Sequence, residues 1–405
     1  MPGNGLILAI ESSCDETAAA IVQRGSRTLS SVVASQIATH ARYGGVVPEL
    51  ASREHLRAIV PVVRAAIEQA QISFSDLDAI AVTSGPGLAG ALLVGITYAK
   101  ALAYAQNLPL IAVNHLEGHI HAVLLNEREQ HRLLNNNDSL HDSDEPALAL
   151  VVSGGHTHLY LARPAHGTWS YTLVGRTVDD AAGEAYDKVA KLLGLGYPGG
   201  PWIDALSQHG NPHAIPFSFS QIKTKAHLAG KPPRTKAAKT APIANLDPHF
   251  LFSFSGIKTA VLRYVELHNL RPEAESRREA LFTGPDAPAK PTIQDALAAT
   301  DPQTLDLIAS FQHAVVGDLL RKTFAAQEAL GATRVFVTGG VAANRELRAR
   351  FTTEAVRRNL HVGFPTLSLS TDNAAMIAAA AWPRLQAGEF APPSLSADPS
   401  LALGL

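Results

Sequence analysis

The chain has 405 residues, which is enough for two or three domains of ordinary size. Hydrophobic residues make up 46% of the sequence and charged residues 17%, and this composition excludes a disordered chain. Its 34 Lys and Arg residues nearly balance its 36 Asp and Glu residues, and the net charge of −2 does not indicate nucleic-acid binding over the whole surface.

The single cysteine and the length of the apolar runs set further limits. Cys14 alone can form neither an intramolecular disulfide nor a zinc site made of cysteines, and we interpret it as structural. The longest apolar stretches, such as Ala374–Trp382, are far shorter than the roughly 20 residues that span a bilayer. No basic segment precedes an apolar run at the start of the sequence, so no secretory signal is visible. We therefore expect a cytoplasmic globular protein with no membrane contact.

Strands and helices alternate through the first part of the chain. Strands are predicted at Leu6–Ile10 and Thr17–Gln23, on either side of the polar turn Glu11–Glu16. Pro48 can open a helix as its first residue, and apolar residues then recur at helical spacing to about Gln71.

The same alternation continues after this helix. A strand at Ala79–Thr83, a helix at Leu88–Ala105 and a strand at Leu110–Val113 follow, and a further helix carries His115 and His119. Strands that alternate with helices at this spacing predict an α/β fold with a largely parallel sheet.

The pattern restarts in the second half of the chain. Residues 147–161 predict a strand, a Gly turn and a strand, which is the layout of residues 6–21. A third apolar strand in Arg334–Gly340 precedes a helix. Two halves that each open on a strand–turn–strand hairpin predict a duplicated domain with a cleft between the copies.

We therefore divide the chain into two lobes. The first comprises residues 1–125 and is completed by a C-terminal helix around 372–387, and the second comprises residues 147–371. Residues 126–146, with three consecutive asparagines and mixed charge, predict a surface insertion. Helical and basic insertions are expected within the second lobe at about 205–303, and the Pro- and Ser-rich residues 388–405 predict a flexible tail.

The basic insertion has an unusual local charge. Lys223–Lys239 carries six basic residues and no acidic residue, and it is either a solvated loop or an arm that contacts nucleic-acid phosphates. The segment before it, Phe217–Thr224, nearly repeats at Phe252–Thr259.

Two histidines on one predicted helix are the first candidates for a metal site. His115 and His119 are four residues apart and share one face, which suits a single metal ion but also fits two unrelated core or surface histidines. A zinc protease is disfavoured because Leu116 occupies the position of its general base and Glu117 points to another face. Asp372, at the start of a predicted helix, is either a third ligand or only the N-cap of that helix.

Two Gly-Gly turns lie in matching places of the predicted copies. Ser153–Gly155 follows a buried strand, and Thr338–Gly340 precedes a helix expected to begin near Val341. Such turns leave backbone N–H groups free to face an anion, and a helix N-terminus attracts phosphate. Either turn alone is more often a simple tight turn, but the pair favours a phosphate or nucleotide site.

Two other polar clusters leave their roles open. Asp180, Glu184 and Asp187 share one stripe of a predicted helix, which is either a solvated acidic face or a set of partners for nucleotide hydroxyls or a metal. His156 and His158 share one face of a strand, where an exposed polar face is favoured over a second metal site.

Nine motifs in order give the sequence a resemblance to a known family. The chain closely resembles the bacterial TsaD (Gcp/YgjD) family of tRNA adenosine threonylcarbamoyltransferases from about Leu6 to Leu385. The motifs are Glu11–Thr17, Ser84–Gly87, His115–His119, Val152–Thr157, Asp179–Lys188, Tyr197–Pro201, Phe252–Thr259, Thr338–Asn344 and Thr371–Ile377. The sequence departs from the family pattern at His158, where Gln is common, and at Ser370, where Cys is common.

The resemblance implies both a fold and a reaction. The family has the actin-like ATPase (ASKHA-type) fold, in which two related α/β lobes flank a nucleotide cleft. Its members transfer the threonylcarbamoyl group from threonylcarbamoyl-AMP to N6 of adenosine 37 in tRNAs that read codons beginning with A. The products are N6-threonylcarbamoyladenosine (t6A) and AMP.

The resemblance also implies site residues. His115, His119 and Asp372 match the family's ligands for one Fe²⁺ per subunit, with Zn²⁺ as the alternative metal. We add the hypothesis that Asp15 or Glu16 acts as the catalytic group that accepts a proton from the amine. The positions that match substrate-binding residues are Val151, Val152, Ser153, Gly154, Gly155, Asp187, Gly200, Asp204 and Asn344.

Partners follow from the family as well. The expected partners are tRNA, a TsaB-like paralogue, a TsaE-like ATPase and a TsaC-type enzyme that supplies the adenylate. Three rival functions remain: a sugar or carboxylate kinase of the same fold, a metalloprotease, and a non-catalytic scaffold of the actin or chaperone type.

Overall fold

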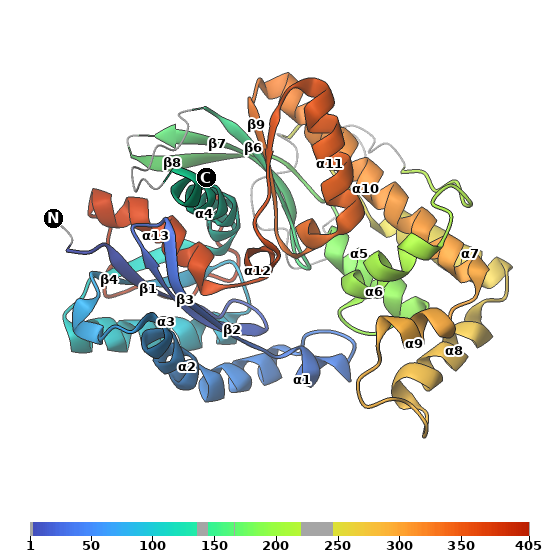
Figure 1. Cartoon of the computed structure of the whole chain (residues 1–405), viewed down its shortest axis with the longest axis horizontal. Helices are drawn as coiled ribbons and strands as arrows, with labels where there is room; N and C mark the ends of the chain where they lie inside the picture. Colours follow the sequence, from blue (N-terminus) through green and yellow to red (C-terminus); the bar gives the residue numbers. More distant parts are fainter. Residues whose placement is uncertain (1–2, 136–144, 166, 220–245, 405) are drawn as a thin grey trace, which may run out of the picture.

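The computed structural model describes residues 3–135, 145–165, 167–219 and 246–404. Ten strands in these ranges form two five-stranded mixed sheets, and helices cover them (Figure 1). None of the described helices combines the length and the apolar character that a bilayer-spanning helix needs. The predicted basic run, residues 223–239, lies outside the described residues.

The two sheets have the same topology. The first has the order β3-β2-β1-β4-β5 and the second β10-β9-β6-β7-β8. In each sheet three neighbouring strands pair in parallel, and two further strands are added by antiparallel pairing. This repetition confirms the predicted α/β fold with two related lobes. The strands are β1 Leu6–Glu11, β2 Glu16–Gln23, β3 Arg27–Ser35, β4 Ala79–Gly85, β5 Leu110–Asn114, β6 Ala147–Val152, β7 Thr157–Ala165, β8 Thr168–Arg176, β9 Arg334–Thr338 and β10 His361–Gly363.

Side chains alternate along β1 and bury both faces of the first sheet. Even-numbered residues such as Leu8 pack toward α2 (Pro48–Ala70) and α3 (Ala89–Gln106). Odd-numbered residues such as Ile7 pack toward α13 (Ala374–Ala387). A strand covered on both faces has no polar side, which explains why β1 is a continuous apolar run.

Helix α4 (His115–Asn135) belongs to the cores of both lobes. Ala122 and Leu125 lie in the apolar cluster of the first sheet and α13. Ile120 and Leu124 lie in a second cluster with residues of β6, β7 and β9. The helix therefore packs against both sheets, and Figure 1 shows it lying between them.

Residues 126–135 differ from the prediction of a surface insertion, because they continue α4. The Asn126 amide donates a hydrogen bond to the carbonyl of Phe364 at 2.9 Å, and the Arg128 guanidinium donates to the carbonyl of Gly25 at 2.9 Å. The polar residues of this segment thus have fixed partners in both lobes. The rest of the predicted insertion lies largely outside the described residues.

The second lobe carries most of the remaining helices. Leu148 and Leu150 of β6 point into its main core, which these helices cover. The predicted helical insertion contains α8 and α9, which lie at one end of the molecule beside α6 (Figure 1). The helices are α5 Ala182–Leu192, α6 Gly199–Leu206, α7 Ser255–Leu267, α8 Arg271–Arg278, α9 Ile293–Ala298, α10 Pro302–Leu330, α11 Arg345–Arg358 and α12 Leu367–Ser370, and the first lobe adds α1 Ile37–Ala41.

The predicted flexible tail is instead fixed on the body of the protein. Its backbone N–H groups donate to the first lobe, from Ala391 to the carbonyl of Leu110 at 2.7 Å and from Asp398 to the carbonyl of Ser84 at 3.0 Å. Gly85 has a positive φ of 152°, and a Cβ there would lie 2.0 Å from the carbonyl oxygen of Asp398. The tail therefore runs in close contact with the end of β4.

Candidate metal centre and substrate site

Helix α4 starts directly after β5 and places two imidazoles on its first turns. The ring centroids of His115 and His119 are 4.7 Å apart, and both side chains are buried. The Asn114 side chain accepts a hydrogen bond from the N–H of Leu116 at 2.9 Å, which satisfies a backbone donor at the start of the helix. The predicted pairing of the two histidines on one face is present.

Asp372 completes this cluster from the other end of the chain. Its Oδ1 lies 3.2 Å from Nε2 of His119 and 3.6 Å from Nε2 of His115. Helix α13 can approach α4 this closely because Gly118 has no side chain; a Cβ there would lie 2.7 Å from Ile377. Residues more than 250 positions apart in sequence thus meet at one point.

The N-cap of α13 is Asn373 rather than Asp372. The Asn373 side chain accepts a hydrogen bond from the N–H of Met376 at 3.0 Å. The alternative that Asp372 serves only as a cap is therefore wrong, and its carboxylate is left to face the histidines.

The donor set of the cluster fits a divalent metal ion. One ligand atom from each of His115, His119 and Asp372 lies within 4.8 Å of the others. Nε2 of His119 faces Asp372, and within the described part of the chain its buried Nδ1 has no hydrogen-bond partner, so the ring is not committed to any other group of the protein. Two imidazoles and one carboxylate with open positions suit Fe²⁺ and also Zn²⁺.

Electrostatics at the cluster favour a positive charge. Burial acts to raise the pKa of Asp372, but His115 and His119 outweigh it and hold this pKa below its ordinary value. Burial acts to lower the pKa of His115, but Asp372 and Glu11 outweigh it and raise this pKa to about 9. A metal ion at this point would take the place of the imidazolium proton.

His156 and His158 lie beside this cluster and are partly buried, so the expected exposed polar face is wrong. The ring centroid of His156 is 6.4 Å from that of His115 and 5.4 Å from that of His158. Burial and the neighbouring His115 and His119 lower the pKa of His156 to about 3. Both strand histidines are therefore neutral at physiological pH.

The turn between β1 and β2 brings two more carboxyl groups toward the second lobe. Burial and the carboxylate of Asp15 raise the pKa of Glu16 to about 9. Burial and then Asp15 and Asp187 also raise the pKa of Tyr197, which belongs to the second lobe. Glu16 is therefore protonated at neutral pH, so it is a proton donor there rather than a base.

The predicted substrate residues Val151–Gly155 include the end of β6 and the turn that follows it, and only the turn is accessible. Val151 and Val152 are fully buried and paired in the sheet. Gly154 and Gly155 are exposed, and a Cβ at either position would meet no atom within 4 Å. A ligand can reach the backbone of this turn but not the two valine side chains.

The other predicted substrate residues gather around α6 and the start of α11. Asp187 accepts a hydrogen bond from the N–H of Gly199 at 2.7 Å, and burial raises the pKa of Asp187 to about 6. Asp204 forms an ion pair with Arg345 at 2.8 Å. Asn344 is the N-cap of α11, and Gly200 lies in the first turn of α6. The helix after Gly340 thus begins at Arg345 and follows a 3₁₀ turn, later than the predicted start near Val341.

The predicted acidic stripe is not a bare acidic face, because Lys188 pairs with both Asp180 and Glu184. Asp180 precedes α5, and its carboxylate pairs with Lys258 at 2.6 Å and Lys188 at 2.9 Å. The neighbouring Asp179 accepts hydrogen bonds from the N–H and hydroxyl of Ser255. These contacts join the motif at 179–188 to the motif at 252–259, so these two acids have a structural role.

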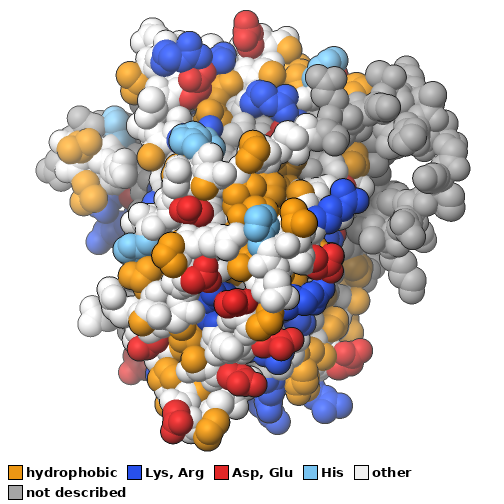
Figure 2. All heavy atoms as spheres, turned by 90° about the vertical axis from the view of Figure 1, so that its right-hand side faces the viewer, with side chains coloured by type: hydrophobic (Ala, Val, Ile, Leu, Met, Phe, Trp, Pro, Cys, Tyr) orange, Lys and Arg blue, Asp and Glu red, His pale blue; other side chains and the backbone are white. Residues whose placement is uncertain are grey.

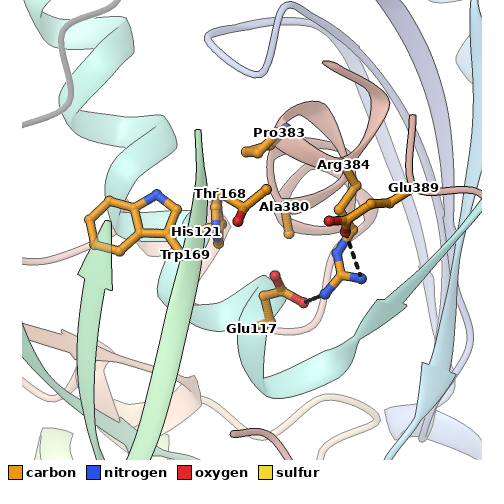
Figure 3. A pocket seen from close by; sticks show the side chains of 8 residues that line it. All are labelled: Glu117, His121, Thr168, Trp169, Ala380, Pro383, Arg384 and Glu389. Atoms are coloured by element: carbon orange, nitrogen blue, oxygen red, sulfur yellow. Dashed lines mark hydrogen bonds and ion pairs between the residues drawn. The ribbon is translucent and has the colours of Figure 1, made fainter. Parts of the chain in front are cut away.

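Another face of α4 lines a separate pocket (Figure 3). Glu117 points into it and forms an ion pair with Arg384 of α13 at 2.8 Å, close to Glu389 and Trp169. Burial raises the pKa of Glu117. Because this carboxyl group faces away from the His–His–Asp cluster, the structure offers no support for a protease that uses it as a base.

Glu11 is a residue whose contact with the cluster we did not anticipate. It is the last residue of β1, fully buried, and its carboxylate lies 3.1 Å from Nδ1 of His115. An acidic residue at the end of an otherwise apolar strand was the available signal, since a buried charge needs partners.

Fold and site together define a two-lobed α/β protein of the actin-like, ASKHA-type class with a buried cluster that could hold a metal. The solved structure of HypF from T. kodakarensis shares this fold, with a TM-score of 0.51 and 13% identity over 98% of this chain and 50% of that chain. Sequence comparison then identifies the family. The profile of "TsaD: tRNA N6-adenosine threonylcarbamoyltransferase" matches residues 27–379.

Similar relatives carry the same description. The tRNA N6-adenosine threonylcarbamoyltransferase of Koribacter versatilis is 58% identical over 400 residues, which cover 99% of each chain. That of Symbiobacterium thermophilum is 45% identical over 402 residues, covering 99% of this chain and 98% of the relative. The chain therefore belongs to the TsaD family of tRNA N6-adenosine threonylcarbamoyltransferases. This membership argues against the kinase, protease and scaffold alternatives.

Proposed function

We propose that the chain transfers the threonylcarbamoyl group from threonylcarbamoyl-AMP to N6 of adenosine 37 in tRNA, with one Fe²⁺ or Zn²⁺ held by His115, His119 and Asp372. The observation that carries the proposal is the convergence of two buried histidines and the partly buried Asp372 between the two lobes. A metal bound there supplies Lewis-acid chemistry that polarises a carbonyl group.

The donor is a mixed anhydride, so AMP is a good leaving group and the reaction depends on positioning more than on a strong nucleophile. The exposed backbone of Gly154 and Gly155 supports an assignment to the adenylate, since a glycine turn can present N–H groups to an anion. At the start of α11 the N–H groups of Arg345 and Leu347 already donate to the side chains of Asp204 and Asn344. Asp187, Gly200, Asp204 and Asn344 line the same region of the second lobe in this proposal.

The amine of the acceptor must lose a proton during transfer. Glu16 is a poor acceptor at neutral pH because burial and Asp15 raise its pKa to about 9. We assign the acceptor role to Asp15, the neighbouring carboxyl group in the same turn. Asp15→Asn should therefore lower the transfer rate much more than Glu16→Gln.

The proposed reaction also requires a surface of the protein that binds tRNA. On the side that Figure 2 shows, Lys and Arg side chains of the described residues are interspersed with Asp and Glu side chains. This mixed face does not favour phosphate binding. The basic run 223–239 remains our candidate for phosphate contacts.

Nucleoside analysis of tRNA tests the proposal. The protein would be incubated with tRNA, threonine, bicarbonate and ATP, together with a TsaC-type enzyme, a TsaB-like paralogue and a TsaE-like ATPase. We expect t6A with the wild type and none with His115→Ala or Asp372→Asn. Glu117→Gln is the matched control, because Glu117 lies on the same helix but faces another pocket. Activity of His115→Ala without bound metal would refute the metal's role.

A further inference from the structure

A buried carboxylate lies against the ring nitrogen of His115 that faces away from Asp372. We propose that Glu11 is a positioning residue for the metal centre: it holds His115 in the tautomer that carries hydrogen on Nδ1 and presents the Nε2 lone pair to the metal. The inference rests on the proposed metal site and adds a residue to it.

Three donors fix the Glu11 carboxylate in place. Its Oε1 accepts from the N–H of Ser13 at 2.5 Å, and its Oε2 accepts from the Thr83 hydroxyl at 2.6 Å and lies 3.1 Å from Nδ1 of His115. An ionised carboxylate only accepts hydrogen bonds. The His115 nitrogen that faces the carboxylate therefore carries the hydrogen, and the Ser13 hydroxyl oxygen, also 3.1 Å from this Nδ1, can accept it as well.

The opposite nitrogen is then the one that can bind a metal. Nε2 of His115 lies 3.6 Å from Oδ1 of Asp372, on the side where Nε2 of His119 also lies. Metal-binding histidines commonly donate their other N–H to a carboxylate, which fixes the ring orientation and makes the ligating nitrogen more basic. Glu11 and His115 have this arrangement.

His119 shows that the arrangement is specific to one ligand. Within the described residues, Nδ1 of His119 is buried and has no hydrogen-bond partner. His115 is therefore the ligand whose orientation is fixed before a metal binds. Two strands of the first sheet hold the His115 ring in this orientation: Glu11 is the last residue of β1, and Thr83, which donates to Glu11, lies in β4.

A purely structural role is the main rival, since Glu11 also joins the ends of β1 and β4 through Thr83. Two variants separate the roles. Glu11→Gln keeps the shape but replaces one oxygen by an NH₂ group, so the side chain can no longer accept from all three donors. Thr83→Val removes the link between strands but leaves the carboxylate beside His115.

Zinc binding to the metal-free full chain, measured by calorimetric titration, tests the inference. We expect Glu11→Gln to weaken Zn²⁺ binding about 10- to 100-fold, the usual effect of losing such a partner. Thr83→Val should bind Zn²⁺ close to the wild-type affinity, with thermal midpoints of both metal-free variants recorded alongside. A second readout is the Nδ1–H signal of His115 in ¹H–¹⁵N spectra of the zinc-loaded protein, which Glu11→Gln should shift or remove.

The outcomes distinguish the inference from the proposed function. If the wild type binds Zn²⁺ and Glu11→Gln binds it equally tightly, the positioning role is wrong and the metal site stands. If both variants lose affinity in proportion to their loss of thermal stability, Glu11 is structural and the inference is again overturned. If the wild type binds no Zn²⁺, the proposed metal site fails and the inference fails with it.

Discussion

The side-chain amide of Asn344 donates a hydrogen bond of 2.6 Å to the side-chain carbonyl of Gln312, while its own carbonyl oxygen caps α11 through the N–H of Leu347 at 2.9 Å. Both ends of this side chain are thus already engaged within the protein. A substitution of Asn344 therefore affects helix stability as well as any nucleotide contact, and the two effects need separate variants.

We expect Asn344→Ala to lower the free energy of unfolding by about 1 kcal/mol, because the helix loses its cap. Asn344→Asp keeps a capping oxygen but loses the amide that donates to Gln312, so it should recover only part of this stability. Both variants should bind AMP more weakly than the wild type, measured by calorimetric titration, with little change in tRNA binding. Wild-type AMP affinity in Asn344→Asp would remove this residue from the nucleotide site.

Loading the His–His–Asp cluster should stabilise the fold. A ligand that binds only the native state at a hundredfold excess over its Kd adds about 2.7 kcal/mol. We therefore expect Zn²⁺ to raise the Tm of the metal-free wild type and EDTA to reverse the rise. Asp372→Asn should show no rise, whereas Glu117→Gln should behave as the wild type does. A Tm increase that persists in Asp372→Asn would point to a different zinc site.

Stability should depend on pH through Glu16. Its pKa rises from 4.5 to about 9 in the folded protein, so the fold favours the protonated form. The stabilisation is complete below about pH 4.5 and is lost as the pH rises toward 9. Glu16→Gln cannot ionise and should lose less stability than the wild type between pH 6 and 9 in urea unfolding. Glu68→Gln, an exposed change on α2, should follow the wild type. Parallel curves for Glu16→Gln and the wild type would contradict the raised pKa.

The C-terminal tail should contribute to global stability. Leu403 is 7% exposed and packs in the cluster that includes Leu116 and Tyr171. Leu403→Ala should therefore cost about 2 kcal/mol in denaturant unfolding. Leu367→Ala, at a leucine that is 65% exposed, should change the stability by less than about 0.5 kcal/mol. Equal effects of the two changes would mean that the tail does not hold the fold.

The basic run should act on tRNA rather than on the adenylate. Changing Lys231, Arg234, Lys236 and Lys239 together to Ala should raise the Kd for tRNA and flatten its dependence on salt, because phosphate contacts release counterions. AMP affinity should stay the same. An unaltered salt slope would place the tRNA surface elsewhere.

Local sequence patterns were sufficient to predict the strands and helices near the site. The continuous apolar run that forms β1 and the four-residue spacing of His115 and His119 are visible directly in the sequence. The position of Asp372 relative to the histidines is not visible in the sequence, because it depends on how α13 packs on α4. From the residues alone, Asp372 was either a third ligand or an N-cap, and the resemblance to a family favoured the ligand.

The errors have a common physical origin. Residues 126–135 and the tail lack an apolar period, and we predicted an insertion and a flexible end. Polar contacts with distant parts of the chain help to hold both segments, such as Arg128 with Gly25 and Asp398 with Ser84, and Leu403 adds apolar packing in the tail. Composition reports the buried apolar surface that a segment can contribute, but it does not report hydrogen bonds to a particular partner. We did not predict that Asn373 caps α13 for the same reason, since Asp and Asn are equally good N-cap residues and Asp372 is its neighbour.

Helix α4 has a mechanical consequence for the enzyme. Because its side chains pack into both lobes, a rotation of one lobe relative to the other that keeps both sets of contacts would turn about this helix. His115 and His119 lie near that axis and would shift little, so the ligand geometry would survive opening and closing. The turns at Asp15 and Gly154 belong to different lobes, so such a rotation would change the distance between them. The protein would thus vary the access of large substrates while its metal ligands stay at the pivot.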